Sequence, residues 1–218
     1  SAKRNFTYAQ AYGGGRGGGG STDPILGSTP QITGWADEDH YLEVRSDSGD
    51  RQVYAVSAVD GSAEVYRDFS DIQANLPDDF DANQAAATTG DLTGFVFQNG
   101  GDLFHYDATT ERFRRLTATP ATENNPRFSP DGSWVAYTRD RNLYAYDLAG
   151  SVEHQYTTDG SDVVYNGWAS WVYFEEILGR GSRYAAFWWS PDSSRLAFMR
   201  FDDTPVPEFP IYHADGHH

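Results

Sequence analysis

The chain has 218 residues and a formal net charge of −16 at pH 7; 15% of its residues are aromatic and none is cysteine. The aromatic content favours sheets over helices and argues against a chain that is disordered throughout. The absence of cysteine excludes disulfides, cysteine nucleophiles and zinc–thiolate sites. The acidic balance makes nucleic acid a poor partner, because phosphate binding needs a basic patch.

The basic residues are almost all arginine, since Lys3 is the only lysine. Salt screens the self-repulsion of such an acidic surface, so adaptation to a salty environment is a hypothesis for this chain. No apolar run approaches the roughly 18 residues of a membrane-spanning helix. The first residues also lack the apolar centre of a signal peptide. We therefore expect no membrane-spanning segment.

Residues 1–31 are predicted to form a flexible Gly-rich N-terminal segment. Seven of the eight residues 13–20 are glycine, a composition that holds a helix or a strand poorly. A phosphate-binding loop is the alternative, but the stretch lacks a Gly-Lys-Ser/Thr ending and a preceding apolar strand. Residues 32–218 are predicted to form the folded part.

Pairs of short strands joined by tight turns are predicted along the folded part. "YLEVRS" and "RQVYAVSA" flank a turn at residues 47–50, and Gly100 and Gly101 separate "GFVFQN" from "DLFHYD" as a hairpin. "WVAYTRD" and "NLYAYDL" form a third pair, and "RLAFMRF" is a further strand. Residues 68–89 are predicted to be a loop with a helical turn.

A repeat gives the fold class. "FSPDGSWVAYTRD" at residues 128–140 matches "WSPDSSRLAFMRF" at residues 189–201, and "GWADEDHYLEV" from Gly34 resembles the same unit without its proline. The Pro-Asp-Gly/Ser corner is a good turn, and the strand after it alternates. Repeated four-stranded units of this size indicate an all-β protein, a β-propeller whose blades bury their faces against one another.

An insertion is predicted between two of the repeats. The Ser-Pro-Asp corners begin at Ser129 and Ser190, 61 residues apart, whereas a blade takes about 40–50 residues. The excess falls at residues 157–188, around the stretch "NGWASWVYFEEILG". Insertions of this kind form loops at the rim of a propeller, where functional residues are common.

Two adjacent acids, Glu175 and Glu176, stand inside that insertion behind an aromatic run. Neighbouring carboxylates repel each other and lose hydration when aromatic side chains crowd them, and a cationic ligand relieves both costs. A primary ammonium has three donors, so it can satisfy both acids. The pair is suited to hold a free peptide amino terminus. The alternative from spacing alone is a solvated helix start.

The sequence of the insertion and the following strand resembles the propeller of the dipeptidyl peptidase IV family, which belongs to the prolyl oligopeptidase-type serine peptidases. The resemblance is specific over residues 163–209, weaker back to Trp35 and very weak before that. The matching positions are Asn166, Gly167, Trp171, Val172, Tyr173, Glu175, Glu176, Trp189, Ser190, Pro191, Phe201, Asp202, Val206 and Pro207.

The resemblance implies an eight-bladed propeller joined to an α/β-hydrolase domain in an exopeptidase that releases dipeptides. It implies that Glu175 and Glu176, on a short helix, bind the amino terminus of a peptide substrate, with Trp171 and Tyr173 supporting that helix. The chain would hold about four of the eight blades, with the α/β-hydrolase catalytic domain missing from it. A periplasmic or secreted location is the expectation from the resemblance.

Three positions depart from the family's pattern. Phe174 replaces the first of three acids, and Ser170 replaces an Asp often found before the Trp. The family also places an arginine on an upstream hairpin to hold the substrate carbonyl, but "FVFQNGGDLFHYD" offers none. Arg112, Arg114 and Arg115 follow that hairpin, and the sequence assigns this role to none of them.

No catalytic residue is predicted in this chain. No Gly-x-Ser-x-Gly elbow occurs in the sequence, and the scattered histidines build neither a triad nor a metal site. No cofactor is expected. The expected partners are a peptide with a free amino terminus, the hydrolase domain and, for the open sheet faces, a second copy of the chain. A non-catalytic propeller that binds proteins or peptides is the alternative function.

Overall fold

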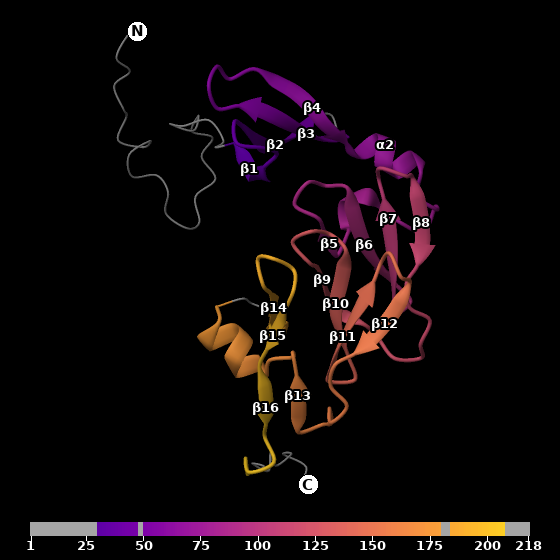
Figure 1. The fold of residues 1–218 in the computed structure, drawn as a ribbon, viewed down its shortest axis with the longest axis vertical. Coiled ribbons are helices and arrows are strands. Elements are labelled where there is room, and N and C mark those ends of the chain that lie inside the picture. The colour runs from indigo at the N-terminus through magenta and orange to yellow at the C-terminus, as the bar shows by residue number, and fades with distance from the viewer. Residues whose placement is uncertain (1–29, 48–49, 180–183, 208–218) are drawn as a thin grey trace, which may run out of the picture.

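Short antiparallel strands dominate the computed structural model, which describes residues 30–47, 50–179 and 184–207 (Figure 1). Most of the predicted Gly-rich segment and the histidines of the C-terminal tail lie outside the described residues. In chain order the strands are β1 (Gln31–Trp35), β2 (His40–Asp47), β3 (Asp50–Ser57), β4 (Ala63–Asp68), β5 (Ala87–Thr88), β6 (Gly94–Asn99), β7 (Asp102–Asp107), β8 (Arg112–Arg115), β9 (Asn124–Phe128), β10 (Trp134–Arg139), β11 (Asn142–Asp147), β12 (Val152–Gln155), β13 (Val164–Asn166), β14 (Phe187–Trp189), β15 (Leu196–Phe198) and β16 (Arg200–Asp202). The helices are α2 (Phe69–Ala74), the 3₁₀ turn η1 (Ala82–Gln84) and the π-helix η2 (Tyr173–Ile177).

The strands form blades in chain order. The described residues contain three four-stranded sheets, β1-β2-β3-β4, β5-β6-β7-β8 and β9-β10-β11-β12, and two two-stranded pieces, β13-β16 and β14-β15, that belong to a fourth blade. In Figure 1 these blades follow an arc, with β5 and β9 toward its concave side and β8 and β12 on its outside. The predicted partial propeller of about four blades is confirmed, and its described sheets do not close into a ring.

The repeated corners have the same geometry in the third and fourth blades. The hydroxyls of Ser129 and Ser133 donate to the carboxylate of Asp131, and those of Ser190 and Ser194 donate to Asp192. Hydrogen bonds from Ser129 and Ser133 lower the pKa of Asp131 to about 2. These bonds satisfy the turn locally, which is why the Ser-Pro-Asp pattern could be recognised in the sequence.

Two hairpin tips, one in the second blade and one in the third, contain residues in the left-handed backbone conformation. Between β6 and β7, Gly100 and Gly101 have φ values of 61° and 95°, as the predicted two-residue turn requires. The equivalent tip between β10 and β11 places Asp140 and Arg141 at 49° and 60°. Glycine adopts this conformation freely and aspartate tolerates it, whereas an arginine bears strain there. The third blade therefore holds an arginine on a strained tip.

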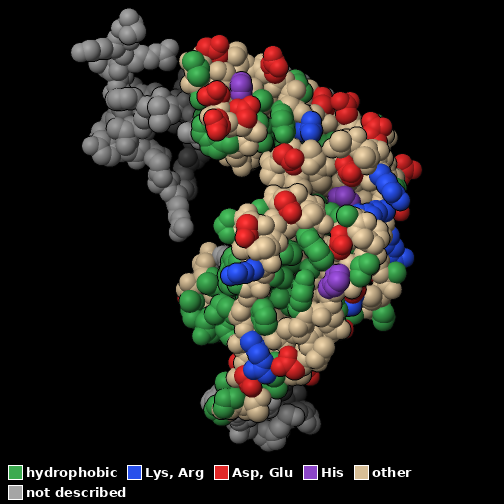
Figure 2. All heavy atoms as spheres, viewed as in Figure 1, with side chains coloured by type: hydrophobic (Ala, Val, Ile, Leu, Met, Phe, Trp, Pro, Cys, Tyr) green, Lys and Arg blue, Asp and Glu red, His purple; other side chains and the backbone are tan. Residues whose placement is uncertain are grey.

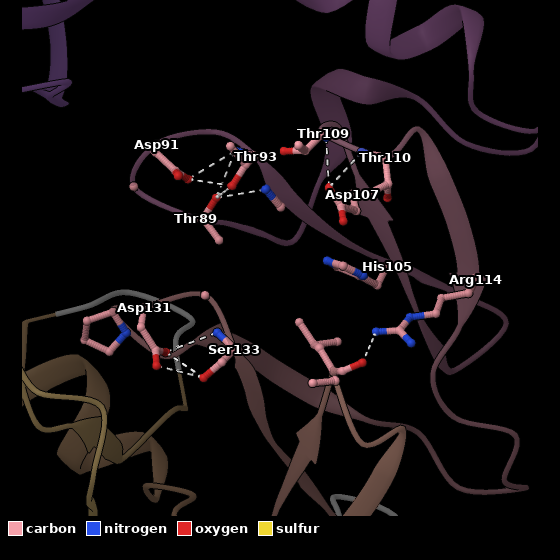
Figure 3. Close-up of a pocket in the computed structure, with 16 residues that line it drawn as sticks. Thr89, Asp91, Thr93, His105, Asp107, Thr109, Thr110, Arg114, Asp131 and Ser133 are labelled. Atoms are coloured by element: carbon pink, nitrogen blue, oxygen red, sulfur yellow. Dashed lines mark hydrogen bonds between the residues drawn. The ribbon is translucent and has the colours of Figure 1, made fainter.

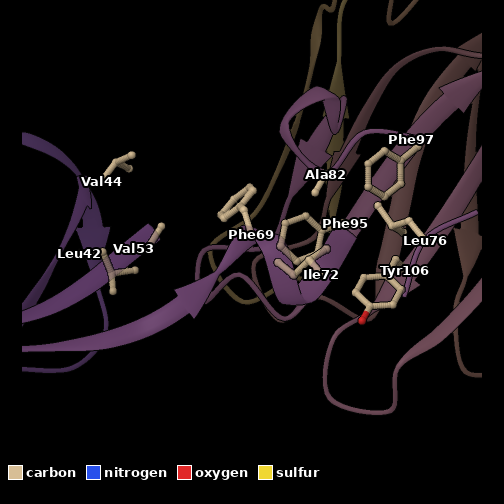
Figure 4. Packing of buried hydrophobic residues seen from close by; sticks show 10 residues of the cluster. All are labelled: Leu42, Val44, Val53, Phe69, Ile72, Leu76, Ala82, Phe95, Phe97 and Tyr106. Atoms are coloured by element: carbon tan, nitrogen blue, oxygen red, sulfur yellow. The ribbon is translucent and has the colours of Figure 1, made fainter. Parts of the chain in front are cut away.

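Hydrophobic clusters lie between neighbouring blades. The first one joins Leu42, Val44 and Val53 of the first blade to Phe95 and Phe97 of the second, and Figure 4 shows the buried members of the cluster. It also includes Phe69 and Ile72 of α2, which begins at an Asp68 cap within the predicted loop. Similar clusters join the second blade to the third and the third to the fourth. Each blade therefore depends on its neighbours for stability.

A buried ionic network includes Glu123, the last residue of the link between the second blade and β9. Glu123 is fully buried and accepts hydrogen bonds from Thr117 and Thr119 at 2.9 and 2.8 Å. Arg139 donates to Glu123 at 3.1 Å and to Glu153 at 2.7 Å. The network ties the end of the second blade to β10 and β12, because its members come from all three places.

Acidic side chains spread over the first blade and α2 on the face drawn in Figure 2. Part of the net charge of −16 therefore lies on the surface of the first blade and α2. None of the described helices is both long and apolar enough to cross a membrane.

Candidate functional site

The predicted insertion opens inside the first strand of the fourth blade. β13 pairs with β16 and β14 pairs with β15, so β13 and β14 are two halves of one strand. The amide of Gly167 donates to Met199, and the amide of Met199 donates to Ala186, which closes the ladder across the gap. The sequence placed the insertion between strands, and the structure locates it within one strand.

The third blade shows why the chain can leave the sheet at this point. In β9, pairing with β10 shifts between Ala136 and Thr138, and Asn125 takes a left-handed φ of 57°. Such a bulge leaves one residue out of the hydrogen-bond ladder. At the corresponding place in the fourth blade the chain departs at Gly167 and returns at Ala186, so few ladder bonds are lost.

The first and last residues of the insertion pair with each other at its base. The amide of Ala169 donates to the carbonyl of Tyr184 at 2.6 Å, and Trp168 forms an isolated bridge with Ala185. The rings of Trp168 and Tyr184 are stacked with centroids 4.7 Å apart. The base is therefore an ordered extension of the blade.

The helix η2 carries the predicted Glu-Glu motif, as expected from the resemblance. It is the orange coil beside β15 and β16 in Figure 1, on the concave side of the arc. The amide of Phe174 donates to Ser170, four residues back, whereas that of Leu178 donates to Tyr173, five residues back. This widened turn is a π-helix, a feature that often marks functional sites.

The aromatic run anchors the helix through two of its members. Phe174 is buried and its ring lies 4.1 Å from that of Tyr184. Tyr173 is half-buried and packs edge-to-face on Phe201 at 4.5 Å. Trp171 is 58% exposed. The phenylalanine that replaces the family's first acid is therefore the buried anchor of the helix.

Glu175 and Glu176 are both exposed, directly after this anchor. Within the described residues, neither carboxylate forms a hydrogen bond or an ion pair. The two acids are therefore fixed at the backbone while their oxygens remain accessible. That arrangement suits a ligand that brings its own positive charge and donors.

Two of the three arginines after the second-blade hairpin, Arg114 and Arg115, have structural partners. Arg114 donates to the carbonyl of Leu148 and the hydroxyl of Ser151, and Arg115 forms an ion pair with Asp102. The hairpin itself carries Gly100 and Gly101 and no arginine. A different arginine, Arg141, lies beside the base of the insertion, with its guanidinium over the rings of Tyr165 and Trp168.

A hollow of about 620 Å³ lies elsewhere, between the corner loops of the second and third blades (Figure 3). Asp91, Asp107 and Asp131 line it, and each accepts hydrogen bonds from neighbouring amides or hydroxyls of its own turn. Burial, with a smaller effect of Arg114, lowers the pKa of His105 in this hollow to about 4. Across residues 30–47, 50–179 and 184–207, no group of three acids or histidines could hold a metal.

Radial four-stranded sheets with a core between each pair define this chain as part of a β-propeller. The family described as "Dipeptidyl peptidase IV (DPP IV) N-terminal region" matches residues 94–217, which is more than half of the chain. The chain belongs to this family. The match contains the insertion and the Ser190 corner, on which the resemblance rested, and also the Ser129 corner of the repeat.

Relatives with similar sequences carry peptidase names. The chain is 41% identical over 102 residues to "Probable dipeptidyl-aminopeptidase B" of Chaetomium globosum, a match that covers 44% of this chain and 11% of the relative. It is 37% identical over 117 residues to "Probable dipeptidyl peptidase 4" of Aspergillus fumigatus, covering 53% and 15%. The matched part thus spans a small fraction of each relative's length.

A solved structure supports the fold. The crystal structure of Porphyromonas gingivalis dipeptidyl peptidase 4 superposes with a TM-score of 0.55 and 24% sequence identity, covering 85% of this chain and 27% of that one. At this identity the likeness shows the fold alone. It extends the comparison beyond the region that the sequence relatives match.

Sequence reasoning did not single out Trp168, Tyr184 or Arg141 as parts of the site. Their contacts join residues that are 16 and 27 positions apart in the sequence, so no local pattern reports them. The one available signal was the high aromatic content of the insertion. The structure explains this aromatic content, because stacked rings form the small core of the insertion.

Proposed function

We propose that this chain is the substrate-gating and amino-terminus-binding propeller portion of a serine exopeptidase that releases dipeptides from peptide amino termini. The observation that carries the proposal is the pair Glu175 and Glu176, exposed and without a cationic partner among the described residues, on a helix anchored by Phe174. Membership in the family and the names of the relatives support it.

The chemistry follows from the geometry of an ammonium group. Its three N–H donors point in different directions, so two carboxylates from neighbouring residues can accept two of them. Charge-assisted hydrogen bonds of this kind are about twice as strong as neutral ones. An acylated amino terminus has lost the charge and most of these donors, so the site would discriminate free from blocked peptides.

The bond that is cleaved would lie at a set distance from the anchored amino terminus. A nucleophile held by a separate α/β-hydrolase domain would then meet the bond after the second residue. The sequence of this chain contains no Gly-x-Ser-x-Gly elbow, so the proposal assigns the nucleophile to a domain outside it. The propeller would then position the peptide by binding its amino terminus, and the other domain would cleave the bond.

The test uses the full-length parent enzyme with Glu175→Gln and Glu176→Gln, each of which removes a charge and keeps the shape. For a peptide with a free amino terminus, kcat/KM should fall about ten- to a hundredfold in each variant, as expected for a lost charged hydrogen bond. Glu64→Gln is the matched control, because Glu64 is an exposed acid of β4 in the first blade.

Unchanged kinetics in both Glu175→Gln and Glu176→Gln would refute the proposed role. A parent that binds peptides through these acids but hydrolyses none would favour the non-catalytic binding propeller. Equal loss in the Glu64→Gln control would show a general effect of surface charge and would also count against the site.

A further inference from the structure

We infer that Arg141 is a positioning residue that holds the base of the insertion and thereby orients Glu175 and Glu176; the inference rests on the proposed function of those two acids. Arg141 belongs to the third blade, whereas the acids belong to the fourth. The connection between them is a continuous series of contacts, each of which the structure shows.

The backbone at Arg141 gives the first step. Its φ is 60° and that of Asp140 is 49°, in a tip where the second blade uses Gly100 and Gly101. A glycine would adopt this turn with less strain. The hairpin turn does not require an arginine at this position. Any advantage of arginine over glycine here must therefore come from its side chain. Strained residues of this kind often accompany functional sites.

The side chain of Arg141 packs on the residues where the chain leaves the sheet. Its guanidinium carbon lies 4.6 Å from the ring centroid of Tyr165 and 5.3 Å from that of Trp168. Its carbonyl accepts a hydrogen bond from the amide of Asn166 at 2.9 Å. Arg141 thus contacts residues on both sides of Gly167, where β13 ends and the insertion begins.

Gly167 makes the exit rigid. It has a φ of 68°, and a Cβ there would meet Leu143 at 3.1 Å and Phe187 at 3.3 Å. The backbone therefore lies close against the third and fourth blades at this residue. With the exit fixed, the orientation of the Trp168 ring depends on what packs on its faces, which are the guanidinium of Arg141 and the ring of Tyr184.

The stacked rings connect Trp168 to the helix η2, so the position of the Trp168 ring affects that of the helix. Trp168 stacks on Tyr184 with an interplanar angle of 20°, and Tyr184 packs against Phe174 with centroids 4.1 Å apart. Phe174 directly precedes Glu175 in η2. Packed rings move together, because a gap between them loses dispersion contacts on both sides. Loss of the guanidinium should therefore loosen η2.

The charge environment supports a role in holding the rings. No carboxylate of the described residues forms an ion pair with Arg141, although the protein has a net charge of −16. A cation–π contact is the interaction that remains, and it is favourable for an arginine stacked on tryptophan or tyrosine. Preorganised carboxylates bind a ligand more tightly because less freedom is lost on binding.

The first test measures amide hydrogen exchange by NMR in this chain with Arg141→Gly. Glycine suits the left-handed tip, so the global unfolding midpoint should stay the same or rise. The amides of Ala169, Phe174 and Leu178, which donate within the insertion, should exchange about five- to thirtyfold faster, as expected for a lost cation–π contact. Arg141→Lys keeps the charge and should show a smaller increase.

A matched control is Arg45→Ala. The guanidinium of Arg45 lies 4.3 Å from the ring centroid of Tyr54 in the first blade, so it loses the same kind of contact far from the insertion. Exchange at Ala169, Phe174 and Leu178 should not change in this variant. An equal increase there would mean that the insertion responds to any loss of stability, which would overturn the inference.

The second test measures KM and kcat of the full-length parent with Arg141→Gly and Arg141→Lys. We expect KM for free-amino peptides to rise severalfold in Arg141→Gly with kcat nearly unchanged, and Arg141→Lys to restore part of the loss. Unchanged exchange in Arg141→Gly would overturn the inference, and so would a raised KM without faster exchange, since Arg141 would then contact the substrate itself. Faster exchange with unchanged KM would keep the positioning contact and refute the proposed role of Glu175 and Glu176.

Discussion

The ring of Phe174 lies 4.1 Å from the ring of Tyr184, across the two arms of the insertion. This contact buries the residue that precedes the acidic pair, so the exposed acids are carried by a hydrophobic anchor. The anchor belongs to a small cluster with Ala169, Ala186 and Phe201. A short helix outside the main core depends on such a cluster, because it is too short to be stable alone.

Phe174→Ala should release η2 while the blades remain folded. Deleting a buried phenylalanine costs about 3 kcal/mol, which here falls mainly on the local opening of the insertion. Limited proteolysis should cut the insertion about a hundredfold faster at that cost. Phe198→Ala removes the same group from a side chain that is 40% exposed and should have a much smaller effect. Equal cleavage of the two variants would contradict the anchoring role.

Arg139→Met should destabilise the whole chain. It leaves the fully buried Glu123 without its cation, which costs about 3–5 kcal/mol in buried pairs. Denaturant unfolding measures the loss. Arg200→Ala is the control, since its ion pairs with Asp159 and Asp202 are exposed to solvent and should contribute little to stability.

The double variant Arg139→Met with Glu123→Gln isolates the buried charge. Removing both partners should recover part of the stability that Arg139→Met loses, because no unpaired charge remains. Additive losses would show that the network acts through packing, for example through the contact of Arg139 with the Tyr144 ring.

Stability should fall as the pH drops from about 6.5 toward 4, in part because of His105. Burial lowers the pKa of His105 to about 4 in the folded chain, below its ordinary value of 6.5. The unfolded chain therefore binds this proton first, and its contribution is present above pH 6.5 and lost as the pH falls to 4. The loss approaches about 3 kcal/mol at 1.36 kcal/mol per pH unit.

Urea unfolding of the wild type and of His105→Leu across this pH range measures the contribution. The variant should show a shallower decline between pH 6.5 and 4, because it has no group to protonate in the hollow between the second and third blades. Parallel pH profiles of the two proteins would show that His105 does not titrate between its folded and unfolded values.

Salt should raise the thermal midpoint of the chain. At a net charge of −16 the folded state bears considerable self-repulsion, which a molar salt screens to within about 3 Å. Both NaCl and KCl should raise the midpoint between 0.05 and 1 M, whereas an uncharged osmolyte at equal osmolality should lack this charge-dependent part. A midpoint that does not rise with salt would count against salt adaptation.

The strands and turns were largely predictable because their signals are local. The short apolar runs in "GFVFQN" and "WVAYTR" form β6 and β10 as expected, and each strand has four consecutive buried residues, so both of its faces are covered. The Ser-Pro-Asp corners satisfy their own hydrogen bonds within a few residues. A short apolar run bounded by turns and a turn that satisfies its own hydrogen bonds need no distant partner, so the sequence alone shows them.

The insertion was predictable in existence but not in position. The 61-residue spacing of the corners revealed extra chain, yet its departure from within a strand depends on the pairing of β13 with β16 and β14 with β15. Pairing joins residues that are far apart in the sequence, and the pattern "RLAFMRF" gave one strand where the structure has two. Register of this kind is decided only when both partners are in place.

By itself the sequence determined the all-β character, the repeated blades, the acidic surface and the adjacency of Glu175 and Glu176, because each is a property of neighbouring residues or of composition. Only the tertiary structure decided that these acids are exposed on a helix anchored by Phe174 and that Arg141 of another blade lies over Trp168. Those contacts depend on how whole blades pack, and packing brings together residues whose separation along the chain carries no signal.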